Sequence, residues 1–298
     1  MMPTQIIART EQTMRLRDGR TLGYGEFGLP NGKPIFFFHG WGDSRLTRHP
    51  DDTLTAAAAV RLITVDRPGF GLSDFQTHRT LLDWPSDIIQ LADKLGLSRF
   101  GILGHSGAGP HALACAYKIP DRLAAVGISS GFAPMDRPNG TDGLSKQMQQ
   151  GVKMFRHMPW MARLAFASLP KQYRSNAKQA FEKQFGPLLS SADRAVMENR
   201  EVCDNHLQGA VEALRQGSTG LAHEAVLFMG RPWGFCPEDI RVKVWLWYGQ
   251  DDAVVPPQMG QYLAHAIPNS HFTLFPGEGH MLHITHWTEL LTTLANQL

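Results

Sequence analysis

Short apolar runs that alternate with helix-like segments predict an α/β protein whose mostly parallel sheet is flanked by helices. Residues 34–38 form a fully apolar run and residues 61–65 a largely apolar one, as expected of strands covered on both faces. Strands that alternate with helices build βαβ units, in which the strands are parallel. Residues 132–235 break this rhythm because they contain no clear strand-like run. We therefore expect a helical insertion within an α/β core.

The elements of this core are expected in order along the chain. The first two strands flank Asp18-Gly19, a dipeptide that favours a hairpin turn. A helix begins near Pro85, has apolar residues at helical spacing and ends at Gly96. The eight expected strands are residues 13–17, 21–27, 34–38, 61–65, 100–103, 123–129, 242–248 and 271–275. Further helices are expected at residues 46–59, between Ser106 and Pro120, and at residues 257–266 and 284–296.

Composition and charge argue against several classes of protein. The chain has 298 residues, of which 43% are hydrophobic and 19% are charged, which suits a sizeable core. Lys and Arg number 29 against 27 Asp and Glu, and the resulting net charge of +2 favours neither nucleic acid nor an anionic membrane as a partner. No apolar run approaches the roughly 20 residues of a membrane helix. The N-terminus also lacks the long apolar stretch of a signal peptide.

The cysteines bear on the compartment in which the protein works. Cys115, Cys203 and Cys236 lie far apart and are odd in number. This pattern fits neither a disulfide framework nor a zinc site. We therefore expect a protein of the reducing cytoplasm.

Two parts are expected within the chain. Residues 1–131 and 236–298 would form the α/β core, and residues 132–235 would form a helical cap inserted after the sixth strand. The expected cap is rich in Met, Gln, Arg and Ala, and residues such as Pro159 and Pro170 divide it into separate helices.

The turn at residues 100–110 carries the first candidate for chemistry. An apolar strand ends at Gly104, Ser106 lies on a tight turn, and a helix follows in which Pro110 falls in the first turn. A serine on such a sharp strand-to-helix turn is typical of a nucleophile elbow. Ala108 replaces the second glycine of the G-x-S-x-G pattern, and the lysine of a phosphate-binding loop is missing.

Four short motifs follow one another, each at the end of an expected strand. They are His39-Gly40, Asp66-x-x-Gly69-x-Gly71-x-Ser73, the Ser106 turn, and Gly249-x-x-Asp252 followed by Gly279-His280. With these motifs the chain resembles the capped α/β-hydrolases, esterase-like serine hydrolases among them, over nearly its full length. Ligands of open α/β sheets lie beyond the carboxyl ends of the strands, so these loops are expected to converge.

Ser106 is the predicted nucleophile, and a serine hydroxyl needs a base within hydrogen-bond reach. Among 13 histidines, His280 is preferred because it follows the last strand and a glycine pair, in the family's order of Ser, Asp and His. The family pattern G-x-x-D selects Asp252 as the acid that orients the imidazole, while Asp251 is expected to cap the following turn. Asp136, in the loop after the sixth strand, is the weaker alternative acid.

The other histidines are expected to have structural roles. His283 and His286 follow His280 at three-residue steps, but no carboxylate or cysteine accompanies them at ligand spacing, so no metal is expected. A place on the surface or in the core is expected for His78, His157, His206 and His223.

The negatively charged oxygen of a tetrahedral intermediate needs fixed hydrogen-bond donors. The backbone N–H of Gly107, directly after the nucleophile, is one candidate. The resemblance implies the backbone N–H of Trp41, directly after His39-Gly40, as the second, while the Trp41 indole lines the pocket or packs under the cap. His39 is expected to support its loop, and residues 66–73 are expected to brace neighbouring loops.

We therefore predict a serine hydrolase that cleaves small to medium, fairly apolar carboxylic esters, lactones or thioesters through an acyl-enzyme on Ser106. No cofactor is needed, a small molecule is the expected partner, and a homodimer is left open. An apolar series near the start of the cap is expected mostly to pack on the core and in part to line the cleft. Its members are Met148, Met154, Phe155, Met158, Trp160, Met161 and Phe166.

Other functions are compatible with the same fold. Proteins of this fold also hydrolyse carbon–carbon bonds beside a ketone, cleave cyanohydrins, form peroxides or transfer acyl groups. Epoxide hydrolases and haloalkane dehalogenases share the fold and the cap but use an aspartate nucleophile, and Ser106 argues against both. A ligand-binding protein that has kept the fold is the non-enzymatic alternative.

Overall fold

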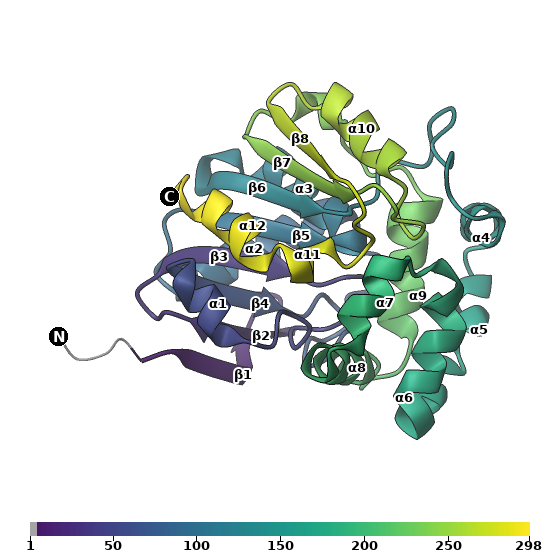
Figure 1. Cartoon of the computed structure of the whole chain (residues 1–298), viewed down its shortest axis with the longest axis horizontal. Helices are drawn as coiled ribbons and strands as arrows, with labels where there is room; N and C mark the ends of the chain where they lie inside the picture. The colour runs from purple at the N-terminus through teal and green to yellow at the C-terminus, as the bar shows by residue number, and fades with distance from the viewer. Residues whose placement is uncertain (1–4) are drawn as a thin grey trace.

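Eight strands pair into one sheet in the computed structural model, which describes residues 5–298 (Figure 1). The strand order is β1-β2-β4-β3-β5-β6-β7-β8. β2 runs antiparallel to both of its neighbours, and the other neighbouring pairs are parallel, which confirms the predicted mostly parallel sheet. The strands are β1 (Ile7–Arg15), β2 (Thr21–Gly28), β3 (Lys33–Phe38), β4 (Val60–Val65), β5 (Phe100–His105), β6 (Leu123–Ser129), β7 (Val244–Gly249) and β8 (Ser270–Phe275).

Helices cover both faces of the sheet. Those that flank it are α1 (Asp52–Ala57), α2 (Trp84–Lys94), α3 (Gly109–Lys118), α10 (Pro257–Ala266), α11 (Leu282–Thr285) and α12 (Trp287–Ala295). α1 and α12 pack on one face, and α2, α3 and α10 pack on the other. This arrangement confirms the predicted α/β class.

Successive side chains of β3 enter different hydrophobic clusters, one on each face of the sheet. The Phe38 ring meets Trp84 of α2, with 5.3 Å between the ring centroids. The Phe37 ring points to the opposite face and meets Trp287 of α12, also at 5.3 Å. Because both faces are buried, this strand is apolar without alternation.

The helix expected at residues 46–59 is wrong in its first half, because α1 begins only at Asp52. Residues 45–50 form turns and bends instead. Pro50 has no N–H group to donate and disfavours helical geometry in the residue before it. Asp51 is then the N-cap, and its side chain accepts a 2.9 Å hydrogen bond from the Thr53 N–H.

β1 begins at Ile7, well before the strand expected at residues 13–17. It lies at the edge of the sheet, and most of its side chains are exposed. The pairing register also shifts between Arg9 and Gln12, as at a β-bulge. An exposed, irregular edge strand has no apolar period, so its first half was not recognisable in the sequence.

The chain between β6 and β7 carries a further set of helices. They are α4 (Lys146–His157), α5 (Met161–Phe166), α6 (Leu169–Phe185), α7 (Ser191–Glu198), α8 (Arg200–Ala213) and α9 (Thr219–Glu224), followed by a π-helical turn at Ala225–Gly230. Figure 1 shows α4 to α9 gathered at one edge of the sheet, at the right of the view. We call the segment between β6 and β7 the helical insertion; its expected limits, residues 132 and 235, stay a prediction.

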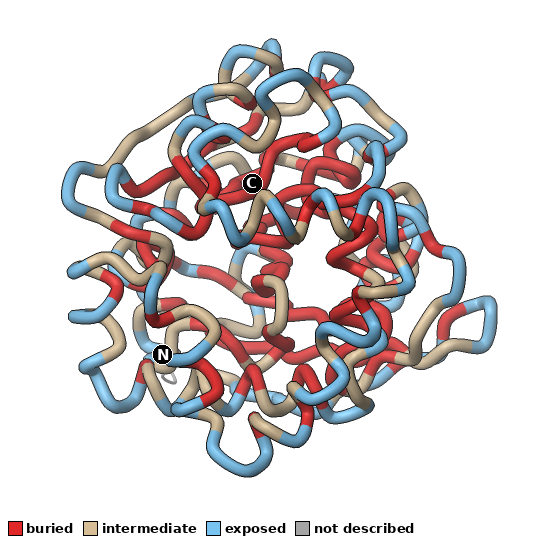
Figure 2. The backbone as a smooth tube through the Cα atoms, turned by 90° about the vertical axis from the view of Figure 1, so that its right-hand side faces the viewer, coloured by how far each residue is buried: buried red, intermediate tan, exposed pale blue. Residues whose placement is uncertain are grey.

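The helical insertion shares a hydrophobic core with the sheet. Phe155 of α4 and Phe228 of the π-helical turn are buried in the same cluster as Phe38 of β3 and Ile102 of β5. Figure 2, which views the molecule from the side of the insertion, shows buried backbone through the centre and exposed backbone at the periphery. The insertion is therefore packed on the core over an apolar interface.

The start of α3 lies directly against the chain that follows β6, so a larger residue at the contact should destabilise the fold. A Cβ added at Gly109 would lie 2.9 Å from the Cα of Gly131, a backbone atom that cannot turn aside. We expect Gly109→Ala to lower the free energy of unfolding by about 1–3 kcal/mol, the usual cost of overpacking. Urea denaturation followed by circular dichroism measures this change.

Gly151→Ala is the matched control for this substitution. Gly151 lies within α4, where an added Cβ would meet only the Phe155 ring, at 3.6 Å. Alanine has a helix propensity better than that of glycine by about 0.8–1 kcal/mol, so this variant should be as stable as the parent or more so. Equal destabilisation by the two substitutions would contradict the assigned contact between Gly109 and Gly131.

Candidate active site

Ser106 lies at the sharp turn between β5 and α3. β5 ends at His105, and residues Ser106–Ala108 form a short 3-10 turn that leads directly into α3. The φ angle of Ser106 is +55°, in the left-handed region that a residue with a side chain seldom occupies. Strain of this kind costs on the order of 1–3 kcal/mol and is concentrated at functional sites. The side chain is buried.

Small residues make this turn possible. A Cβ at Gly104 would lie 3.0 Å from the Ala112 Cβ, and one at Gly107 would lie 2.6 Å from the Trp41 Cβ. Ala108 has a φ of −85°, so its backbone does not need the left-handed freedom of glycine. This explains why alanine replaces the second glycine of the nucleophile-elbow pattern without a strained conformation.

The structure brings the three predicted catalytic side chains together. Ser106 Oγ lies 3.0 Å from His280 Nε2, and His280 Nδ1 lies 2.8 Å from Asp252 Oδ2. Ser106 follows β5, Asp252 follows β7 and His280 follows β8, so three parallel strands deliver the three groups to the same edge of the sheet. With its proton on Nδ1, the imidazole donates to Asp252 and can accept the proton of the Ser106 hydroxyl.

Asp252 also caps the turn that follows it, a role that was expected of Asp251. The second carboxylate oxygen of Asp252 accepts hydrogen bonds from the N–H groups of Val254 and Val255, at 2.9 and 2.8 Å. The Asp251 side chain is exposed, and its backbone N–H donates to the Glu278 carbonyl. The expectation for Asp251 is therefore wrong, because one buried carboxylate can accept from both the turn and the imidazole.

A residue of the helical insertion braces the loop that carries His280. Asp193 of α7 accepts a 2.7 Å hydrogen bond from the Met281 N–H with one oxygen, and with the other it accepts from Ser190. A Cβ at Gly279 would collide with both Ser190 and Asp193. The glycine before His280 is therefore required by a close contact with the insertion, which the sequence pattern alone did not reveal.

The two predicted oxyanion donors lie side by side. A Cβ placed on Gly107 would be 3.1 Å from the backbone nitrogen of Trp41. The Trp41 indole donates a 3.0 Å hydrogen bond to the Leu221 carbonyl of the insertion. Its ring packs edge-on against Phe166, with 5.3 Å between the centroids, so it both lines the cavity and packs under the insertion.

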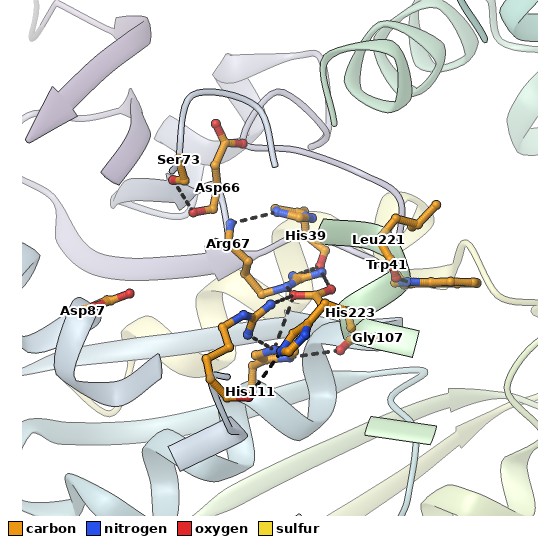
Figure 3. A network of polar contacts seen from close by, with 12 residues as sticks. His39, Trp41, Asp66, Arg67, Ser73, Asp87, Gly107, His111, Leu221 and His223 are labelled. Carbon is orange, nitrogen blue, oxygen red and sulfur yellow. Dashed lines mark hydrogen bonds and ion pairs between the residues drawn. The ribbon is translucent and has the colours of Figure 1, made fainter. Parts of the chain in front are cut away.

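The loops around these donors are held by buried polar side chains (Figure 3). His39 donates from Nδ1 to the Gly40 carbonyl at 2.8 Å, and burial lowers the pKa of His39 well below its ordinary value. Asp66 accepts from the Arg45 guanidinium at 2.8 Å, and Ser73 Oγ donates to the Asp66 carbonyl at 2.7 Å. These contacts agree with the supporting roles expected of His39 and of residues 66–73.

Ser106 and His280 line a cavity between the sheet and the insertion. Most of its wall is apolar; these side chains are Trp41, Phe132, Met148, Leu169, Phe181, Phe185, Leu189, Ala210, Leu214, Leu221, Val254 and Met281. Of the apolar series expected to contribute to the cleft, Met148 alone is among the residues that line this cavity. Trp160 is exposed and Phe155 is packed in the core instead.

Besides Ser106, His280 and the buried pair of His105 and His283, four polar side chains line the cavity, and sequence reasoning did not single them out for it. They are Asp43, His206, Tyr173 and Gln184. His206 was expected to be structural, yet its Nδ1 lies 3.8 Å from Asp43 Oδ1 inside the cavity. The Tyr173 hydroxyl donates to Gln184 at 3.0 Å. Tyr173 and Gln184 belong to α6, His206 belongs to α8 and Asp43 lies in the loop after β3, so the sequence held no spacing that could have grouped all four.

The histidines next to His280 face different neighbours. The buried His283 stacks on His105 with 3.7 Å between centroids, and burial lowers the pKa of both well below the ordinary value. His286 contacts two carboxylates, Glu278 at 3.3 Å and Glu289 at 3.0 Å, which the sequence analysis had not anticipated. Within residues 5–298, no group of three or more His, Cys, Asp or Glu side chains is arranged to hold a metal ion.

Comparison with known proteins identifies the family. The family model described as alpha/beta hydrolase fold matches residues 33–286. The chain belongs to this alpha/beta hydrolase fold family. A solved structure similar to this hydrolase-fold chain is a thermophilic esterase from Thermogutta terrifontis, with a TM-score of 0.68 and 22% identity over 98% of this chain and 97% of that one. The predicted resemblance is thus confirmed.

Two curated relatives are similar in sequence to this alpha/beta hydrolase. The pimeloyl-[acyl-carrier protein] methyl ester esterase of Neisseria meningitidis serogroup B is 26% identical over 262 residues, which are 85% of this chain and 88% of that protein. The dihydrolipoyllysine-residue acetyltransferase component of the acetoin cleaving system of Pseudomonas putida is 27% identical over 203 residues. That match covers 63% of this chain and 53% of the Pseudomonas protein.

The electrostatic surroundings of His280 in this hydrolase suit a group that gains a proton. Burial lowers its pKa, but the charge and hydrogen bond of Asp252, together with the charges of Asp193 and Asp43, outweigh burial and leave the pKa raised. Across residues 5–298, none of the helices is both long enough and apolar enough to cross a lipid bilayer.

Asp252→Asn tests this electrostatic assignment. The substitution removes the negative charge beside Nδ1 at nearly constant volume, so the pKa of His280 should fall. The parent imidazole should be half-protonated at a pH above about 6.5, the ordinary value for histidine, and the variant imidazole at a lower pH than the parent. Histidine ring signals followed by NMR across the pH range measure both.

Asp251→Asn is the matched control. It removes the same charge from the neighbouring residue, whose side chain is exposed. We expect the His280 titration to be unchanged in this variant. An equal downward shift in both variants would mean that general charge, rather than the direct contact with Asp252, sets the protonation of His280.

Proposed function

We propose that this protein is a serine hydrolase that cleaves small to medium, fairly apolar carboxylic esters, including lactones and thioesters. The observation that carries the proposal is the 3.0 Å contact between Ser106 Oγ and His280 Nε2 at the wall of a largely apolar cavity. A strained serine in contact with a base that is itself oriented by a carboxylate is the arrangement that nucleophilic acyl transfer needs.

The proposed reaction has two halves. In the first, Ser106 Oγ bonds to the carbonyl carbon of the ester, its proton passes to His280 Nε2, and the carbonyl electron pair moves onto the oxygen. The tetrahedral intermediate then collapses, and the alcohol leaves with the proton from His280. In the second half, His280 takes a proton from water, and the water oxygen bonds to the acyl carbon. The acyl–Oγ bond then breaks, His280 returns the proton to Ser106 Oγ, and the acid is released.

The raised pKa of His280 supports this role, because the imidazole must hold a proton between the two transfers of each half-reaction. The N–H groups of Trp41 and Gly107 are the proposed donors to the negatively charged oxygen. One such donor is worth on the order of 3 kcal/mol of transition-state stabilisation. Their adjacency supports this pairing.

The cavity supports a substrate that is mostly apolar and uncharged. Its wall is formed mainly by aliphatic and aromatic side chains of the insertion. The carboxyl group of Asp43 is buried in the same wall, and an anionic substrate group beside it would be repelled. Two of the similar proteins are named as esterases, one of them for a methyl ester, which agrees with this substrate class.

Hydrolysis of chromogenic esters with acyl chains of increasing length tests the proposal. The parent should hydrolyse them, and Ser106→Ala should reduce kcat by on the order of 10⁴-fold or more, as loss of a serine nucleophile does. The acyl length with the highest kcat/KM then measures the depth of the cavity. Labelling by a fluorophosphonate shows whether the Ser106 hydroxyl is reactive, whether or not the protein accepts carboxylic esters as substrates.

Ser130→Ala is the control, because Ser130 is also a buried serine with a positive φ, +50°, at the end of the neighbouring strand. Its activity should equal that of the parent. Labelling of Ser106 without ester hydrolysis would favour another reaction of the same triad. Neither hydrolysis nor labelling would refute the proposal and favour a ligand-binding protein.

Asp43→Asn tests the proposed preference for uncharged substrates. The substitution removes the buried negative charge, so it should raise kcat/KM for the 4-nitrophenyl hemisuccinate relative to the 4-nitrophenyl butyrate ester. The ratio matters because Asp43 also contributes to the raised pKa of His280, which would change both rates together. An unchanged ratio would show that Asp43 does not discriminate by charge.

A further inference from the structure

Glu224, the last residue of α9, is fully buried and contacts two arginine side chains, Arg67 and Arg79. Its two carboxylate oxygens accept from Nε and Nη2 of Arg67, at 2.7 and 2.9 Å. One oxygen also accepts from Nη2 of Arg79, at 2.9 Å. Arg67 follows β4, so this bidentate ion pair joins the insertion to the core.

The opposite side of the Arg67 guanidinium donates to two successive backbone carbonyls. Nη1 donates to the His39 carbonyl, and Nη2 donates to the Gly40 carbonyl at 3.1 Å. Every nitrogen of the guanidinium therefore has an acceptor, either on Glu224 or on this loop. The rigid fork of an arginine can hold such a set of acceptors in one plane, which a lysine cannot.

The Gly40 carbonyl and the Trp41 N–H belong to the same peptide group. A cationic donor on the carbonyl draws electron density from the peptide and makes its N–H a stronger donor. His39 Nδ1 donates to the same carbonyl and adds to this polarisation. In residues 5–298 the Trp41 N–H has no backbone acceptor of its own, so it is free to donate to a bound group.

The network also contacts the carbonyl of Gly107, the residue whose N–H is the second proposed donor. Arg79 Nη1 lies 3.4 Å from His111 Nε2, and His111 Nδ1 lies 3.2 Å from the Gly107 carbonyl. Burial lowers the pKa of His111 to about 3, so the ring is neutral, and a proton on Nδ1 can be donated to Gly107. One carboxylate of the insertion thus anchors both backbone segments that carry the proposed oxyanion donors.

We propose that Glu224 and Arg67 are positioning residues, which hold and polarise the Gly40–Trp41 peptide so that its N–H stabilises the oxyanion formed at the substrate carbonyl. The inference rests on the proposed function, because that oxyanion forms only if Ser106 attacks a carbonyl carbon. It gives the helical insertion an electrostatic role in the reaction, since Glu224 neutralises and orients the guanidinium from the side opposite the loop.

Glu224→Gln tests this role, because the amide keeps the volume and loses the charge that orients Arg67. We expect kcat to fall about tenfold or more and KM to stay within about twofold of the parent value. Loss of a whole oxyanion donor lowers kcat by about 10²–10³-fold, and the weakened donor should show part of that effect. A trifluoromethyl ketone, which forms a tetrahedral adduct with an oxyanion on Ser106, should bind more weakly by the same factor as kcat falls. Active sites are counted by fluorophosphonate titration, so unfolded protein does not enter these values.

Asp87→Asn is the matched control. Asp87 is buried, and its two carboxylate oxygens accept hydrogen bonds from Nη2 and Nη1 of Arg20, at 2.7 and 2.9 Å. Neither residue of this bidentate ion pair lines the cavity. The variant should lose thermal stability yet keep the kcat and the trifluoromethyl ketone affinity of the parent. If Glu224→Gln fails to fold, Glu224→Asp replaces it; the shorter carboxylate keeps the charge but loses the bidentate geometry, and the same paired losses are expected.

Three outcomes would overturn the inference. Parent values of kcat and ketone affinity in the Glu224 variant would show that the ion pair serves stability alone, while the proposed function stands. A rise in KM with an unchanged kcat would assign Glu224 to substrate binding. A parent protein that neither hydrolyses esters nor reacts with the fluorophosphonate would remove the proposed function itself, and the inference with it.

Discussion

The left-handed backbone of Ser106 is the constraint on which the rest of the site depends. A side chain at positive φ directs Ser106 Oγ out of the turn between β5 and α3, and it requires small neighbours on every side. Gly104, Gly107 and Gly109 each lie within 3.0 Å of another part of the chain when a Cβ is added. Through these contacts the loop after β3, the loop after β6 and α3 pack around the Ser106 turn. The proposed nucleophile lies there beside its base and its oxyanion donors.

The helical insertion contributes more to the site than the wall of a cavity. Asp193 holds the loop of His280 through the Met281 N–H, and Glu224 holds the loop of Trp41 through Arg67. Each is a fully or almost fully buried carboxylate, and a buried carboxylate is stable only with its hydrogen bonds made. The two acids therefore tie the geometry of the core loops to the docked position of the insertion, so the site is complete only when the two parts are packed together.

The departures from the sequence-based expectations share a physical cause. The apolar series at residues 148–166 indicates side chains that tend to be buried, but residue type does not show which neighbour buries them. α4 packs on the π-helical turn and α5 packs on α9, and α6, α8 and α9 supply much of the cavity wall instead. In the same way, both Asp251 and Asp252 could cap a turn by sequence, and only the structure shows that Asp252 caps the turn and also accepts from the imidazole.

The sequence by itself determined the class of fold, the order of the strands along the chain, and the residues at the strand ends that could carry chemistry. These features are local: strand burial and turn glycines follow from residue type and spacing, and the proposed Ser106, Asp252 and His280 follow from short motifs that resemble those of the capped α/β-hydrolases. The tertiary structure decided which side chains line the cavity, which acids brace the loops, and how Glu224 reaches the Gly40–Trp41 peptide. Gly40 and Glu224, for example, are 184 positions apart, and contacts at such separation are set by packing, which leaves no period in a single sequence.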